Sequence, residues 1–218
     1  MSRQVAASTR PYDPVKRVLD VVGAVLGLVV LSPVLVVISA LIRIDSRGPA
    51  LFRQQRVGRG GEPFTMVKFR TMAYGNDESI HREYMRQLVN GEAVSRRNEK
   101  GEEVFLLDDP RVTRVGRVLR RLSLDELPNL FNVLTGDMSL VGPRPPIIYE
   151  VEMYDERSLR RLSVKPGMTG LAQINGRGAL SFERIVAYDL EYVERRSLLF
   201  DLALLAKTVP GVLARRGV

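Results

Sequence analysis

The chain has 218 residues, a formal net charge of +8, a single histidine (His81) and no cysteine. The missing cysteine excludes disulfide bonds, thiolate catalysis and cysteine-ligated metals, and one histidine argues against a multi-histidine metal site or a Ser-His-Asp triad. The positive charge favours an acidic partner, such as anionic lipid, nucleic acid or a phosphorylated small molecule. Only 6% of the residues are aromatic and none is tryptophan, so we expect no nucleic-acid partner.

An uncharged apolar segment runs from Val21 to Ile42. At about 1.5 Å per residue, a helix of this length reaches across the hydrocarbon layer of a bilayer. Ser32 and Pro33 lie in its middle, where proline removes a helical hydrogen bond and bends the axis. Basic residues flank both ends, whereas a single crossing carries them mainly at one end. We therefore predict a re-entrant membrane helix over residues 18–44, broken at Ser32-Pro33; a bent full crossing and a buried core helix are the alternatives.

Asp20 stands at the mouth of this segment, where a carboxylate is costly in lipid unless it is paired. Lys16 lies one helical turn earlier and is the predicted partner, with a solvated Asp20 at the interface as the alternative. Residues 1–17 form a basic N-terminal segment, and residues 45–218 form a single domain on one side of the membrane helix.

The rest of the chain predicts an α+β fold that is mainly helical, with a small β-hairpin or sheet and amphipathic surface helices. Two strands around a glycine-rich turn at Gly58–Gly61 are expected between Leu51 and Met72. Residues 91–108 are charged and resemble an exposed excursion without evident chemistry. Helices are predicted over 77–90, 111–122, 126–135, 147–162, 181–196 and 200–215, a short strand or turn at 138–142, a turn at 165–170 and a polar loop at 173–178.

Two adjacent carboxylates, Asp125 and Glu126, follow an arginine pair, Arg120 and Arg121, a few residues earlier in the chain. One interpretation is structural, because Ser123-x-x-Glu126 fits a capping box in which Asp125 only favours the helix dipole. The other is chemical: an ionised Asp125 at a helix N-terminus can attack phosphorus and form an acyl phosphate. Both carboxylates are then candidate ligands of Mg²⁺, which prefers oxygen ligands.

Several cations are candidate ligands for a phosphate group. Lys68 and Arg70 alternate along a predicted strand, so both project from one face of the sheet, either toward an anion or into solvent. Arg144 is held between prolines in GPRPP, which fix its backbone. Arg120 precedes the carboxylate pair, and Arg177 lies in the glycine-flanked loop NGRG.

Taken together, these segments resemble the bacterial sugar transferase family, the monotopic polyprenyl-phosphate phosphoglycosyl transferases, in its minimal catalytic form. They cover nearly the whole chain in order. This chain departs from the family pattern at Asn129, where glutamine is usual, and at Gly178, where asparagine is common. The matching segments are KRVLD (16–20), the apolar run with Ser-Pro at 32–33, GPALFRQQRVG (48–58), FTMVKFRTM (64–72), the stretch from RVTRVG to VGPRP (111–145), KPGMTGLAQINGR (165–177) and the tail from DLEYV to SLLFDL (189–202).

The resemblance implies an undecaprenyl-phosphate sugar phosphotransferase. Such an enzyme moves a sugar-1-phosphate from a UDP-sugar to a polyprenyl phosphate and releases UMP, at the first membrane step of polysaccharide or glycoconjugate synthesis, for example of an exopolysaccharide. It implies dependence on Mg²⁺, with Asp125 as the nucleophile of a covalent phosphosugar intermediate and Glu126 assisting metal and phosphate binding. The matching cations are Lys68, Arg120 and Arg144. Arg177 also matches, but it is followed by Gly178, where the family commonly has asparagine.

The resemblance also implies a place on the cytoplasmic face of the bacterial inner membrane, in contact with its lipid, with residues 45–218 as the catalytic domain. The alternative is a basic membrane-anchored module without turnover, which binds anionic lipid or a protein partner and uses the carboxylate pair as a capping box. The sequence leaves open which sugar is transferred, which pathway uses it, and whether the protein is a homo-oligomer.

Overall fold

The computed structural model describes residues 5–73, 82–83, 86–87, 111–176 and 180–213. The expected excursion at 91–108, most of the predicted helix at 77–90, and both Arg177 and Gly178 lie outside the described residues, so those predictions stay predictions.

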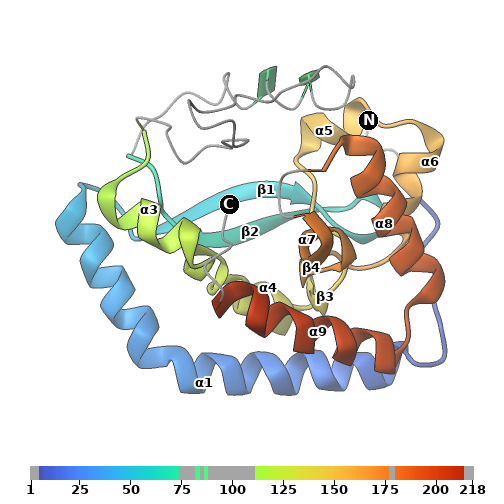
Figure 1. Ribbon diagram of the computed structural model, residues 1–218, viewed down its shortest axis with the longest axis horizontal. Helices are drawn as coiled ribbons and strands as arrows, with labels where there is room; N and C mark the ends of the chain where they lie inside the picture. Colours follow the sequence, from blue (N-terminus) through green and yellow to red (C-terminus); the bar gives the residue numbers. More distant parts are fainter. Residues whose placement is uncertain (1–4, 74–81, 84–85, 88–110, 177–179, 214–218) are drawn as a thin grey trace.

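The longest element is helix α1, Asp13–Asp45, which contains the whole apolar segment. It continues through Pro33, so the predicted break of the helix at Ser32-Pro33 is wrong. The helix changes direction along its length (Figure 1), and an internal proline is the usual physical cause of such a bend. The Ser32 hydroxyl donates to the carbonyl of Val29 at 2.8 Å, within the same helix.

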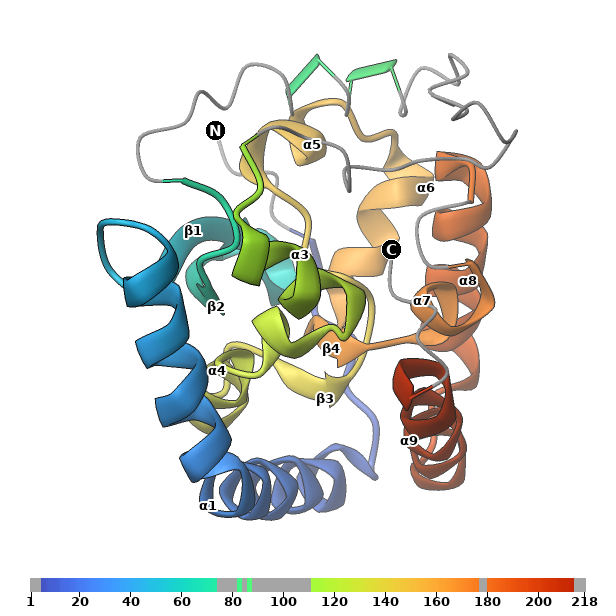
Figure 2. The same cartoon turned by 60° about the vertical axis from the view of Figure 1, so that its left-hand side comes forward.

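Both halves of α1 pack against the body of the protein, which fills the angle between them (Figures 1 and 2). In the first half, Ala24 is fully buried in a cluster with Leu130 and Met138. In the second half, Ile38 and Ile42 are buried against Phe69. Of the most apolar stretch of α1 only 11% is buried, which argues against the buried-core alternative.

The outward face of α1 is apolar and exposed. Val30 is 71% exposed and Val36 is 69% exposed, and their neighbours on this face are also aliphatic. Among the described residues, α1 is the one helix long and apolar enough to cross a membrane. An apolar patch of this extent is typical of a surface that meets lipid or another apolar partner.

Asp20 has a different partner from the predicted one. It is buried, and its Oδ1 accepts hydrogen bonds from the Ser139 hydroxyl and the Leu140 amide, each at 3.0 Å. Lys16 instead forms an ion pair with Asp201 at 2.7 Å. The predicted Lys16–Asp20 pair is therefore wrong, because Asp20 faces the body while Lys16 reaches a different helix.

Strands β1 (Leu51–Val57) and β2 (Pro63–Phe69) form the predicted antiparallel hairpin, with Gln54 opposite Met66. The short helix η1 (Arg59–Gly61) closes the turn, and Gly60 has a φ of 76°, which favours glycine. Strand β3 (Ser139–Val141) pairs in parallel with β4 (Gly167–Thr169). The sequence predicted a short strand or turn where β3 lies, and only a turn where β4 lies.

Short helices surround these two sheets (Figure 2). The predicted helix at 126–135 is split between η2 and α4, the one at 147–162 is split into three pieces, and the polar loop expected at 173–178 begins inside a helix. The two C-terminal helices are confirmed. The elements are α3 (Arg114–Arg121), η2 (Leu124–Glu126), α4 (Asn129–Thr135), α5 (Ile148–Glu152), α6 (Glu156–Leu159), η3 (Arg160–Ser163), α7 (Leu171–Gly176), α8 (Phe182–Arg195) and α9 (Leu198–Leu213).

Candidate active site

The carboxylate pair lies on η2, and the residue before this short helix has an unusual backbone. Ser123 has a φ of 54° and a ψ of 24°, and it is the one non-glycine residue with positive φ in the described part of the chain. A left-handed serine costs on the order of 1 kcal/mol, and such strain gathers at functional sites. The Ser123 side chain makes no capping hydrogen bond. The capping-box interpretation is therefore wrong.

Glu126 is paired with a cation from the hairpin. Its Oε1 lies 2.5 Å from Nζ of Lys68, which stands near the end of β2, and its Oε2 accepts a long hydrogen bond of 3.5 Å from Asn129. Burial raises the pKa of Glu126, but the charges of Lys68, Arg144 and Arg56 outweigh it and hold that pKa below its ordinary value. Glu126 is therefore ionised at neutral pH.

Asp125 lies in a different electrostatic environment from its neighbour. Burial raises the pKa of Asp125 to about 6; Lys68 and Arg120 oppose the rise, whereas the charge of Glu126 adds to it. Above pH 7 the carboxylate is therefore mostly ionised, and this is the form that can act as a nucleophile.

Two of the predicted cations accompany the pair from other elements. Arg120, in the last turn of α3, donates from Nε to the Thr71 hydroxyl at 2.9 Å, and its charge lowers the pKa of Asp125. Arg144 lies in the loop after β3 with an exposed side chain, and its charge lowers the pKa of Glu126. The structure thus places Lys68 in contact with Glu126, and the charges of Arg120 and Arg144 act on Asp125 and Glu126 respectively.

Arg70 is not brought to the carboxylates in the same way. It follows β2, is only 4% exposed, and donates to the backbone carbonyls of Ser46, Arg47 and Gly48 just beyond α1. Its guanidinium therefore ties the end of α1 to the hairpin. The expectation that Lys68 and Arg70 project together from one face fails, because Arg70 lies beyond the last residue of the strand.

A further cation, Arg56 on β1, was not among the candidates. It is buried, and its charge lowers the pKa of Glu126. The sequence offered no signal for it, because the burial of Arg56 follows from the tertiary fold. Register alone could not show that this strand position faces the carboxylates.

The carboxylate oxygens of Asp125 and Glu126 are of the type that could hold a magnesium ion. Among the described residues, no group of three or more histidine, cysteine, aspartate or glutamate side chains is positioned to hold a metal. Mg²⁺ is commonly held by one or two protein carboxylates together with phosphate oxygens and water.

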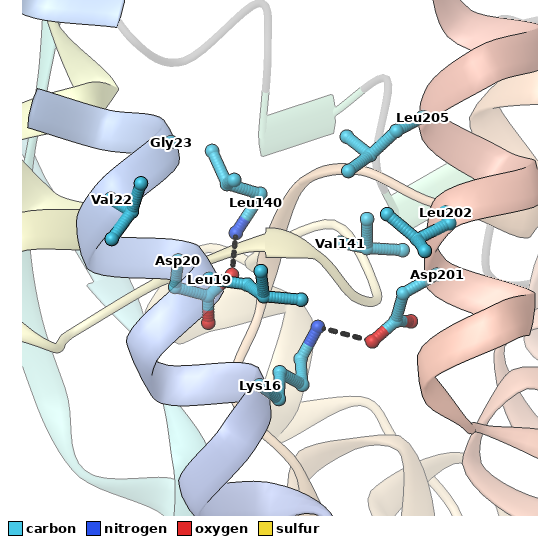
Figure 3. A pocket seen from close by; sticks show the side chains of 10 residues that line it. All are labelled: Lys16, Leu19, Asp20, Val22, Gly23, Leu140, Val141, Asp201, Leu202 and Leu205. Carbon is cyan, nitrogen blue, oxygen red and sulfur yellow. Dashed lines mark hydrogen bonds and ion pairs between the residues drawn. The ribbon is translucent and has the colours of Figure 1, made fainter. Parts of the chain in front are cut away.

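A separate groove of about 210 Å³ lies between α1 and α9 (Figure 3). It holds the Lys16–Asp201 ion pair and Asp20, and its remaining lining is mainly aliphatic. None of the residues around Asp125 lines it. The groove is therefore distinct from the charged cluster, which consists of Asp125, Glu126 and the cations around them.

The comparisons with known proteins place this chain in a known family. The family model described as "Bacterial sugar transferase" matches residues 11–215. The chain therefore belongs to the bacterial sugar transferase family, and it is a transferase.

Individual relatives make the likeness more specific. The exopolysaccharide production protein ExoY of Sinorhizobium fredii is 41% identical over 215 residues, which cover 98% of this chain and 92% of that protein. The UDP-glucose:undecaprenyl-phosphate glucose-1-phosphate transferase of Caulobacter vibrioides is 44% identical over 207 residues, or 91% of this chain and 69% of that protein. The undecaprenyl-phosphate galactose phosphotransferase of Salmonella typhimurium is 42% identical over 202 residues, or 93% of this chain and 41% of that protein.

Proposed function

We propose that the protein transfers a sugar-1-phosphate from a UDP-sugar to a polyprenyl phosphate such as undecaprenyl phosphate, with release of UMP. The relatives' names support the two substrates. The observation that carries the chemistry is the clustering of two carboxylates with four cations beside an apolar helix. A diphosphate requires cations before a carboxylate can approach it.

The reaction proceeds in two displacements at one phosphorus atom. An oxygen of Asp125 attacks the sugar-bearing phosphorus of the donor, the pyrophosphate P–O bond breaks, and UMP leaves with the bonding electron pair. A phosphate oxygen of the polyprenyl phosphate then attacks the phosphosugar on Asp125. The aspartyl P–O bond breaks, Asp125 returns as a carboxylate, and a lipid-linked diphosphate sugar results.

The cations have separate tasks in this scheme. Lys68 keeps Glu126 ionised and helps to neutralise the two carboxylates, whereas the charge of Arg120 favours the ionised form of Asp125. Arg144 has an exposed guanidinium that can accompany a donor phosphate. Asp125 and Glu126 would hold Mg²⁺ together with the donor phosphates, and the ion would supply Lewis-acid stabilisation of the developing charge.

The packing of α1 supports a re-entrant seat on one face of the membrane. Ala24 in its first half and Ile42 in its second half both lie in cores of the same body. A helix that crossed the bilayer would place its ends on opposite faces and would pull that body into the hydrocarbon layer. We place the catalytic body on the cytoplasmic face of the bacterial inner membrane, where nucleotide sugars are made.

The test is a half-reaction with donor alone. The enzyme is mixed with UDP-sugars from a panel, and intact-protein mass spectrometry is used to seek a phosphosugar adduct on Asp125, with UMP measured in parallel. We expect one adduct per active chain and turnover only when polyprenyl phosphate is added. Release of UMP that strictly requires the acceptor, with no adduct, would contradict the covalent scheme while preserving the overall transfer.

A further inference from the structure

Arg56 is a buried cation that no carboxylate pairs with directly. It is 4% exposed, and none of the ion pairs found among the described residues includes it. Instead, its Nε and Nη2 donate to the Gln54 side-chain oxygen at 3.1 and 2.7 Å, and its Nη1 donates to the Pro145 carbonyl at 3.0 Å. Burying a charge is costly, so a buried guanidinium used in this way needs a reason.

The acceptor of that third bond is the residue next to Arg144. The backbone of strand β1 also binds this loop. The Val57 amide donates to the Pro146 carbonyl at 2.9 Å, and Arg56 forms an isolated antiparallel β-bridge with Ile147. From the other side, Arg161 donates to the Arg144 carbonyl at 3.3 Å. The backbone on both sides of Arg144 is therefore fixed.

The side chain of Arg144 is exposed, whereas the backbone of its loop is fixed. Its guanidinium makes no hydrogen bond or ion pair within the described part of the chain. Burial and then the charge of Arg144 lower the pKa of Arg56 to about 10, although the charges of Glu150 and Glu126 oppose this. An arrangement that holds two guanidinium groups near each other is favourable when an anion lies between or beside them, because the anion offsets their mutual repulsion.

We propose that Arg56 is a positioning residue: its hydrogen bond to the Pro145 carbonyl sets Arg144 beside Glu126, at the place where a donor phosphate binds. This inference rests on the proposed function. Gln54 takes part, because it fixes the other two guanidinium donors and thereby aims the third at the loop. A lysine at position 56 keeps the charge but cannot bond Gln54 and Pro145 with this fork geometry.

The experiment is a double-mutant cycle on UMP release, measured as kcat/KM for the donor. Arg144→Gln removes a preorganised cation and should cost about 10²-fold. Arg56→Gln misplaces that cation and should also cost about 10²-fold. If Arg56 acts through Arg144, the double variant falls within about 3-fold of Arg144→Gln, whereas independent effects would multiply to about 10⁴-fold.

Three further variants sharpen the test. Arg56→Lys should lose nearly as much activity as Arg56→Gln, and a fully active lysine variant would overturn the positioning role in favour of charge alone. Arg53→Gln, at an exposed arginine of the same strand, should retain wild-type activity. Gln54→Ala covers the case in which Arg56→Gln does not fold; its smaller loss should disappear in the Arg144→Gln background.

The outcomes separate this proposal from the function on which it rests. A wild-type enzyme that releases no UMP from any UDP-sugar with polyprenyl phosphate contradicts the proposed function itself. An active wild-type enzyme whose Arg56 and Arg144 losses multiply contradicts only the positioning role, as does a Gln54→Ala loss that persists without Arg144.

Discussion

Replacement of Lys68 by methionine tests the charged cluster most directly. Methionine keeps an unbranched apolar stem and removes the ammonium group that lies 2.5 Å from Glu126. Stability should fall because Glu126 loses its partner. The Lys68 side chain is 16% exposed and that of Glu126 is 36% exposed, so water replaces part of the lost interaction.

The size of the stability loss follows from this partial burial. Exposed ion pairs contribute about 0.2–1 kcal/mol, whereas breaking a fully buried pair costs about 3–5 kcal/mol. We therefore expect a loss of about 1–2 kcal/mol, which lowers Tm by about 2–8 °C in a chain of this size. Turnover should fall by about 10²–10³-fold, the usual effect of removing one preorganised charge from a reacting phosphate.

The assay combines thermal unfolding in detergent with UMP release from the donor. Lys207→Met is the control, because Lys207 is an exposed lysine on α9 and should change neither quantity. In a Glu126→Gln background, Lys68→Met should cost much less stability, since the partner is already neutral. A Lys68→Met enzyme with wild-type turnover, or an equal Tm loss in both backgrounds, would refute the reasoning.

Three other changes give separate predictions. Asp125→Asn should abolish turnover yet raise Tm at pH 7, because burial raises the pKa of Asp125 from 3.8 to about 6 and ionisation of this carboxylate therefore opposes folding. In metal-free protein the gain in Tm should shrink as the pH falls from about 6 toward 4. A gain in Tm that does not depend on pH would contradict this prediction. Asp20→Ala strands the buried donors of Ser139 and Leu140 and should cost about 1–3 kcal/mol for each donor left unpaired, with a smaller loss for Asp20→Asn, both measured by thermal unfolding. Gly116→Ala places a Cβ 2.1 Å from the Thr71 carbonyl oxygen and should lower both Tm and turnover. Gly27→Ala is the control, because its Cβ meets only the flexible Leu130 side chain at 3.1 Å, and it should lower Tm less. Equal losses of Tm in the two variants would contradict the view that the backbone clash at Gly116 causes the loss.

Local sequence patterns predicted the elements better than the contacts between them. The glycine-rich turn and alternating apolar positions are sufficient to predict the β1–β2 hairpin, because both signals lie within one short segment. The helix over 147–162 was wrong in its continuity, since Asp155 caps a new helix there by accepting the Ser158 amide at 2.8 Å. An aspartate within a helical pattern can equally face solvent, so the pattern did not reveal the break.

Side-chain partners far apart in the chain were the hardest to predict. Lys16 pairs with Asp201 rather than the nearby Asp20, because the tertiary fold turns the two side chains toward different neighbours. Arg56 was missed for the same reason, as its link to Pro145 spans two unrelated segments. The residues themselves indicated Asp125 as a candidate nucleophile and both Asp125 and Glu126 as candidate Mg²⁺ ligands. The family resemblance added the covalent phosphosugar intermediate.

The double attachment of α1 has a practical consequence for anyone who wants to handle the protein in water. Ala24 and Ile38 each complete a core of the body, so deletion of the hydrophobic helix would open two cavities and unfold the domain that the deletion was meant to preserve. We therefore expect α1 and the rest of the domain to unfold together. A water-soluble version would instead need polar residues at outward positions such as Val30 and Val36, while the inward side of the helix is left untouched.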